Sequence, residues 1–149
     1  MKAPLFRLQD QNGDWQEAKE IYPEGPTVLF FYPKDFTPGC TSEVCDFRDA
    51  MPEFKTLGAQ IFGVSSDSVK SHERFAKKHD LPFPILTDTQ GSLRKAFGVQ
   101  SELFGLLPGR ETFVIDRSGE IVLRYKNMNA KRHRKKAFEA VKELVEGGN

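Results

Sequence analysis

The order of strand-like and helix-like segments predicts an α/β protein built on one central sheet. An unbroken apolar run of strand length at 27–32 predicts a strand buried on both faces, and QIFGVS at 60–65 predicts a second strand. Between the strands, apolar residues recur at spacings of three and four, as Val44, Phe47 and Met51 do, which is typical of amphipathic helices. A chain of 149 residues suits a single domain over 1–149 that buries a core without cross-links.

The segments follow one another as a hairpin, alternating strands and helices, a late hairpin and a closing helix. Asn12-Gly13 accepts the positive φ angles of a tight hairpin turn, Pro33 ends the longest apolar run, and Pro52 is expected to bend or shorten a helix end. Strands are expected at 6–10, 14–18, 27–32, 60–65, 84–88, 112–116 and 120–125. Helices are expected at 40–55, 68–78, 92–97 and 132–146. This order predicts a mainly parallel or mixed sheet covered by helices on both faces, the arrangement of a thioredoxin-like fold.

Composition and charge argue against several classes of partner. The 22 Lys+Arg nearly cancel the 21 Asp+Glu, so neither nucleic acid nor a membrane surface is expected to bind. The basic run Lys131–Lys136 is expected on a solvated face, because it is balanced by Glu139, Glu143 and Glu146. The start, MKAPLFRLQDQNGDW, has no apolar run of signal-peptide length, so we expect a cytoplasmic protein.

Cys40 and Cys45 are the residues that point most directly to chemistry. In a cytoplasmic protein such a pair is more often catalytic, redox-sensing or metal-binding than a permanent cross-link. The run Thr37-Pro38-Gly39 delivers Cys40 to the first turn of a helix, where backbone N–H groups and the helix dipole favour a thiolate. The open ends of parallel strands would give this thiolate access to a ligand. A reactive cysteine is therefore the best single explanation of the motif.

The spacing of the two cysteines predicts motion. If one helix spans both, their Cα atoms lie roughly 8.6 Å apart. Disulfides rarely tolerate Cα separations above ~7 Å, and the two side chains would point to different faces. The reduced, folded chain therefore cannot close this bridge unless the helix between Cys40 and Cys45 unwinds. Taken alone, Cys45 would be interpreted as a small core residue.

The residues around Cys40 resemble those of a known family. Pro33-x-x-x-Thr37-x-x-Cys40 is similar to the peroxiredoxin active-site pattern. The longer run YPKDFTPGCTSEVCDFRD resembles the peroxiredoxin Q or bacterioferritin comigratory protein subgroup. The likeness continues through GVSSDSVKSHERFAKKHDLPFPILTD and GRETFVIDRSGEI, so it covers nearly the whole chain, although the segment 15–26 has no clear match.

The resemblance implies a thiol-dependent peroxidase that uses no cofactor and no metal. Cys40 would be the peroxidatic cysteine, which attacks hydrogen peroxide or an organic hydroperoxide and becomes a sulfenic acid. Cys45 would be the resolving cysteine, which forms an intramolecular disulfide with Cys40 that thioredoxin or a similar dithiol reduces. A monomer is the first expectation for this subgroup, with a dimer as the alternative.

The same resemblance assigns roles around the peroxidatic sulfur. Thr37, Gly39 and Arg110 would bind the peroxide, and Pro33 would shield the sulfur from water. The fixed charge of Arg110 would favour the thiolate and stabilise the peroxide oxygens as the O–O bond breaks. Thr37 alone would be interpreted as a turn or capping hydroxyl, and Arg110 alone as a surface or ion-pairing residue. Glu43 would either orient Arg110 or simply be an acid favoured by the first helical turn.

Three alternatives compete with the peroxidase. A zinc site needs four ligands, and His72, His79 and His133 supply no matching pair; each is expected on a helix surface or in solvent, and His133 is given no role. A general thiol-disulfide oxidoreductase would show C-x-x-C, which is absent. A peroxide-sensing switch or binding module on the same fold would use the same reactive thiol and stays open. Contacts with substrate, partner or a second copy are expected from Phe36, Leu103, Phe104 and Leu106.

Overall fold

The structure is a computed structural model that describes residues 1–99 and 109–148. Leu103, Phe104 and Leu106, for which contacts were expected, lie outside the described residues. The strands are β1 (Arg7–Gln9), β2 (Trp15–Glu17), β3 (Thr27–Phe31), β4 (Gln60–Ser65), β5 (Ile85–Thr87), β6 (Glu111–Ile115) and β7 (Ile121–Lys126). The helices are α1 (Ala18–Ile21), the 3₁₀-helix η1 (Tyr22–Glu24), α2 (Pro38–Thr56), α3 (Val69–His79), α4 (Ser92–Ala96) and α5 (His133–Glu146).

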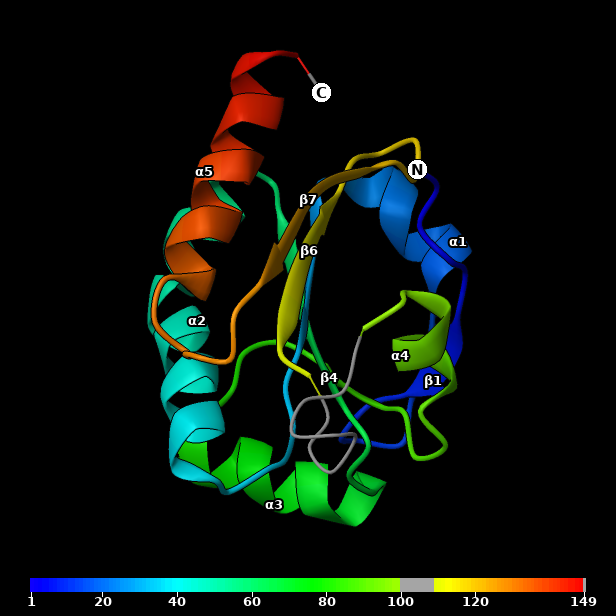
Figure 1. The fold of residues 1–149 in the computed structure, drawn as a ribbon, viewed down its shortest axis with the longest axis vertical. Helices are drawn as coiled ribbons and strands as arrows, with labels where there is room; N and C mark the ends of the chain where they lie inside the picture. Colours follow the sequence, from blue (N-terminus) through cyan, green and yellow to red (C-terminus); the bar gives the residue numbers. More distant parts are fainter. Residues whose placement is uncertain (100–108, 149) are drawn as a thin grey trace.

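The central sheet has the strand order β5-β4-β3-β6-β7 (Figure 1). β3 and β5 both run parallel to β4, whereas β6 runs antiparallel to β3 and to β7. Parallel and antiparallel pairings are therefore equally represented, so the sheet is mixed rather than mainly parallel. The N-terminal hairpin of β1 and β2 is confirmed as a separate sheet, and Gly13 in its turn has a φ of 81°.

Every residue of the central strand β3 is buried, which explains its continuous apolar sequence. Val28 and Phe30 pack in a cluster with side chains of α2, α3 and α5, whereas Leu29 and Phe31 pack in a second cluster with α1 and α4. Helices therefore cover both faces, with α2 and α5 on one side of the sheet and α1 and α4 on the other (Figure 1). The ring of Phe30 stacks on Phe47 of α2, with ring centroids 4.4 Å apart.

The helix α2 begins at Pro38, two residues before the predicted start, and ends at Thr56. Proline is well tolerated in the first helical turn, because the N–H groups there have no helical acceptor in any case. The prediction that Pro52 shortens the helix is wrong: Pro52 lies inside α2. No helix in the described residues is long and apolar enough to cross a membrane.

The pairing of β3 with β6 brings two distant parts of the chain to one edge of the sheet. Phe31 faces Glu111 in this antiparallel pair, so the residue after β3 and the residue before β6 are neighbours. The segment 33–37, called the active-site loop below, leaves β3 at this edge and leads into α2. Arg110 precedes β6 at the same edge. The strand register therefore places Arg110 beside the start of α2.

Candidate active site

Cys40 is the third residue of α2, and Thr37 occupies the N-cap position. The backbone N–H of Thr41 donates to the carbonyl oxygen of Thr37 at 2.8 Å, which starts the helical ladder. The N–H groups of Gly39 and Cys40 come before that bond and have no acceptor within the helix. Together with the helix dipole, they favour negative charge at this place, both on the sulfur and on an incoming oxygen.

Arg110 holds Cys40 and Glu43 together. Its Nη2 donates to Cys40 Sγ at 3.2 Å, and its Nη1 donates to Glu43 Oε1. Its Nε donates to the carbonyl oxygen of Met128 at 3.0 Å, so the guanidinium is fixed in three directions. Gly39 adjoins the guanidinium, since a Cβ added there would lie 3.4 Å from Nη2, in ordinary van der Waals contact. The structure thus brings four of the residues singled out from the sequence into one contact group.

The ion pair of Arg110 and Glu43 is buried, with 5% and 1% of the side chains exposed. Burial raises the pKa of Glu43 to about 8, and the charge of Arg110 opposes this rise. Burial also disfavours the charge on Arg110, but Glu43 and the sulfur of Cys40 outweigh it and raise the pKa of Arg110. The guanidinium therefore stays charged beside the sulfur. Of the two interpretations of Glu43, the contact with Arg110 supports an orienting one.

His133 lies next to Glu43 and is fully buried, so the prediction that it lies in solvent or on a helix surface is wrong. Its Nε2 is 2.8 Å from the carbonyl oxygen of Asn127, which can only accept, so Nε2 carries a hydrogen. Burial lowers the pKa of His133, and the neutral ring then accepts the hydroxyl of Thr112 at Nδ1, 2.8 Å away. In the basic run, Lys131, Arg132, Lys135 and Lys136 are exposed as expected.

Thr37 does not cap α2 with its side chain. Its hydroxyl donates to the carbonyl oxygen of Lys34 at 2.8 Å, which uses its single proton. The oxygen therefore faces its surroundings as an acceptor, suited to the O–H of a ligand. Pro33 is half-buried in the same loop. Cys40 is only 1% exposed, so the access expected from its position at the strand ends is narrow, because Cys40 packs in the apolar cluster of α2 and β3.

Cys45 is not brought to Cys40. One continuous helix spans both residues, as the geometric argument assumed, and both are free thiols. The sulfur of Cys45 instead lies 3.6 Å from His79 Nδ1, at the end of α3. Within the described residues the two cysteines therefore belong to two separate contact groups.

Sequence comparison identifies the family. The pattern that defines AhpC/TSA proteins matches residues 1–124. The chain belongs to the AhpC/TSA family. Within the family it is a member of the peroxiredoxin Q and bacterioferritin comigratory protein group, as the motif predicted. The peroxiredoxin Q of Sedum lineare, described as chloroplastic, is 48% identical over 124 residues, which are 83% of this chain and 66% of the relative.

Solved structures of AhpC/TSA proteins match the fold over almost the whole chain. Peroxidoxin BcpB from Mycobacterium tuberculosis is 35% identical with a TM-score of 0.89, covering 97% of this chain and 96% of its own. The bacterioferritin comigratory protein of Xanthomonas campestris is 34% identical with a TM-score of 0.86, covering 94% and 92%. The thioredoxin-like fold is thereby confirmed. The chain spans between 57% and 66% of the length of the peroxiredoxin Q relatives it matches.

A second buried arginine in this AhpC/TSA chain, Arg94 of α4, joins the two segments that form the site. Its Nη1 donates to the carbonyl oxygen of Gly109 at 2.6 Å, and its Nη2 to that of Tyr32 at 3.0 Å. Gly109 directly precedes Arg110 in the sequence, and Tyr32 directly precedes the active-site loop. The sequence analysis missed Arg94, although its place three residues before Phe97, on the apolar side of a short helix, was a usable signal.

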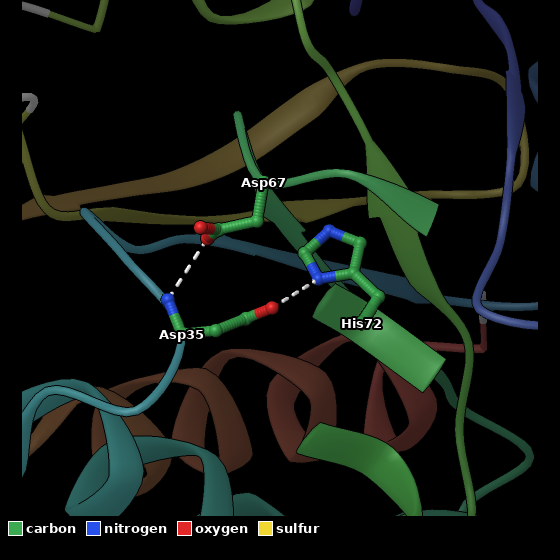
Figure 2. Close-up of side chains that lie close together, drawn as sticks. All are labelled: Asp35, Asp67 and His72. Carbon is green, nitrogen blue, oxygen red and sulfur yellow. Dashed lines mark hydrogen bonds and ion pairs between the residues drawn. The ribbon is translucent and has the colours of Figure 1, made fainter. Parts of the chain in front are cut away.

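The active-site loop is anchored by Asp35 (Figure 2). Asp35 Oδ2 lies 2.7 Å from His72 Nδ1 and accepts from Ser71 Oγ at 2.8 Å, while Oδ1 accepts from the hydroxyl of Tyr32 at 2.6 Å. Burial and the neighbouring Asp35 raise the pKa of Tyr32, so this hydroxyl stays a donor. The backbone N–H of Asp35 donates to Asp67 Oδ2 at 2.8 Å. The loop of this family member is thus tied to α3 and to the turn after β4.

His72 is fully buried, so the prediction of a helix-surface residue is wrong for it as well. The ligand atoms of Asp35, Asp67 and His72 lie within 4.8 Å of one another, close enough to hold a metal ion. Their hydrogen bonds to each other and to neighbouring groups explain the cluster without one. Ser65, whose Oγ is 3.5 Å from His72 Nε2, completes an apparent Ser-His-Asp series, but Ser65 is fully buried and donates to Asp67 at 2.6 Å. The cluster is therefore structural.

Proposed function

We propose that this chain is a thiol peroxidase that reduces hydrogen peroxide and organic hydroperoxides. The observation that carries the proposal is the contact of the Arg110 guanidinium with the sulfur of Cys40, 3.2 Å away, at the N-terminus of α2. This arrangement stabilises a thiolate and offers donors to the oxygens of a peroxide. The structurally similar Xanthomonas campestris protein is described as having alkyl peroxide reduction activity, which supports the same chemistry here.

In the first step, the thiolate of Cys40 attacks the nearer oxygen of the peroxide. An S–O bond forms, the O–O bond breaks, and the released alkoxide or hydroxide takes up a proton to leave as alcohol or water. Arg110 Nη2 and the N–H groups at the start of α2 would hold the two oxygens as charge moves to the leaving one. Thr37 would accept the peroxide O–H, because its own proton is given to Lys34.

In the second step, Cys45 attacks the sulfenic acid of Cys40. An S–S bond forms, the S–O bond breaks, and water leaves. Because both cysteines lie on the one continuous helix α2, the helix must open between them before the two sulfurs can bond. Thioredoxin or a similar dithiol would then reduce the disulfide, becoming a disulfide itself and returning both thiols.

A coupled peroxidase assay with thioredoxin and its reductase tests the proposal. We expect many equivalents of peroxide to be consumed per wild-type chain. Cys40→Ser should abolish consumption, and Cys45→Ser should still oxidise Cys40 once but lose efficient thioredoxin-driven turnover. Full activity of Cys40→Ser would refute the mechanism. Arrest of the wild type after one equivalent would favour the alternative, a peroxide-sensing switch.

The proposal also covers the cell compartment and the oligomeric state of the protein. A cytoplasmic location is inferred from the composition, and the relatives named as chloroplastic make the chloroplast the alternative. Cell fractionation distinguishes the two. We infer a monomer from the subgroup resemblance, and light scattering during gel filtration would detect a dimer.

A further inference from the structure

The thiol of Cys45 has a histidine beside it that neither the motif nor the first catalytic step uses. Cys45 Sγ lies 3.6 Å from His79 Nδ1, within reach of a hydrogen bond to sulfur. Cys45 is on the second turn of α2, and His79 is the last residue of α3. The contact therefore joins the two helices at the proposed resolving sulfur.

His79 is held firmly in this position. Arg48, one helical turn after Cys45, donates from Nη1 to the carbonyl oxygen of His79 at 2.9 Å. The imidazole packs against the ring of Phe75 at a centroid distance of 5.0 Å and an interplanar angle of 72°. Asp80 then ends α3 in a left-handed conformation, with a φ of 50°. Backbone and ring contacts together aim Nδ1 at the sulfur.

Partial burial is the main influence on the pKa of both groups, and it favours a neutral imidazole and a neutral thiol. Burial lowers the pKa of His79, and the cations Lys78 and Arg48 lower it further. Burial raises the pKa of Cys45, and Asp49 adds to this rise while Arg48 opposes it. With both groups neutral, the S–H of Cys45 can donate to the lone pair of Nδ1 in the tautomer that carries its hydrogen on Nε2.

We propose that His79 is the base that removes the proton of Cys45 for disulfide formation, which is a role within the proposed peroxidase. The S–H proton moves to Nδ1, and the thiolate attacks the sulfur of the Cys40 sulfenic acid. An S–S bond forms, the S–O bond breaks, and the departing hydroxide regains a proton as water.

A base is needed because the thiolate, not the thiol, is the nucleophile. At neutral pH a buried thiol is rarely ionised by itself, so resolution without a base would be slow and would speed up with pH. The proton transfer takes place in the folded helix, before Cys45 leaves His79 for Cys40. The imidazolium left behind lies beside Arg48 and Lys78, and their repulsion favours loss of the proton before the helix refolds.

The test measures resolution separately from oxidation. Reduced full-length protein receives one equivalent of hydrogen peroxide, and rapid quenching with mass spectrometry follows sulfenic acid and disulfide from about pH 6 to about pH 9. In His79→Asn and His79→Gln, sulfenic acid should form at the wild-type rate, because His79 does not touch Cys40. Resolution should slow about 10²- to 10⁴-fold near neutral pH. It should recover as pH rises and when imidazole is added.

Lys77→Gln is the matched control, because it removes an exposed charge from the same helix and Lys77 has no part in the proposed step. It should resolve at the wild-type rate. Wild-type resolution rates and pH profiles in both His79 variants would overturn the role, and faster resolution would show that His79 only retains Cys45 in the helix. A wild type that forms no sulfenic acid would overturn the peroxidase itself, so the two failures are distinct.

Discussion

Arg110 and Cys40 are 70 residues apart in the sequence, yet the guanidinium donates a hydrogen bond to the sulfur at 3.2 Å. The contact is a consequence of strand register, because β3 and β6 pair antiparallel with Phe31 opposite Glu111. At the same end of this pair, β3 leads through the active-site loop into α2 and Arg110 directly precedes β6. A shift of one residue in the register would point the arginine to the opposite face of the sheet.

Replacing Arg110 should slow the oxidation of Cys40. Arg110→Met removes the charge and both donors at the sulfur and at Glu43, and we expect the second-order rate with peroxide to fall about 10²–10³-fold. Arg110→Lys keeps a charge but loses the planar fork, so it should lie between this variant and wild type. Stopped-flow kinetics at several peroxide concentrations measure both. An Arg110→Met chain that reacts at the wild-type rate would contradict the assigned role.

Arg94 should matter for both stability and rate. Arg94→Met leaves the carbonyls of Gly109 and Tyr32 without their buried donor, at a cost of about 1–3 kcal/mol for each unsatisfied group. Because these carbonyls precede Arg110 and the active-site loop, oxidation of Cys40 should slow as well. Lys95→Met, in the same helix but exposed, is the control and should change neither. Urea denaturation and stopped-flow oxidation measure the two effects; a rate unchanged in Arg94→Met would show that Arg94 stabilises without positioning.

The pair of Asp35 and His72 should behave as a coupled unit. Removing one partner of a buried hydrogen bond leaves the other unsatisfied, at a cost of about 1–3 kcal/mol and more for a charged group. We therefore expect His72→Leu and Asp35→Asn each to lower the free energy of unfolding strongly. The double variant should lose clearly less than the sum of the two. Denaturant unfolding of all four chains measures this coupling, and strict additivity would disprove it.

Opening of α2 should be local in the disulfide form. The first turns of the helix bury little apolar surface, with Val44 as the one fully buried aliphatic residue before Phe47. Phe47 is stacked on Phe30 of the central strand, which makes its release costly. Amide hydrogen exchange should therefore rise over 40–46 on oxidation and stay slow over 47–56. Exchange that is equally slow over 40–46 in both redox states would exclude the opening.

The apolar framework was predictable from the sequence because burial leaves a local pattern. The continuous apolar run that became β3 needs no distant information, and the spacing of Val44 and Phe47 indicated α2. The mixed sheet was harder, because antiparallel pairing of β6 with β3 depends on where the chain crosses after α4. The meeting of Cys40 and Arg110 followed only from family resemblance, since no local pattern links them.

The burial of the polar side chains could not be predicted from the sequence, and the reason is physical. A histidine in a helix is equally compatible with solvent and with burial, and its partners decide which. For His72 these are Asp35 and the carbonyl of Leu86; for His133 they include the carbonyl of Asn127. All come from other segments. Arg94 is similar, because its two acceptors are backbone carbonyls, which every residue has.

Pro52 in the middle of α2 has a consequence for how far a disturbance of that helix can spread. Proline has no N–H, so the carbonyl of Arg48 receives no hydrogen bond from residue 52, and the helical ladder is interrupted there. Helix formation is cooperative only along an unbroken ladder. Because Pro52 lies beyond Phe47, this interruption is a second barrier to the spread of opening from the cysteine turns to the last turn, where Phe54 lies in the core. The last turn can therefore stay in place in the core while the cysteine turns open and reform.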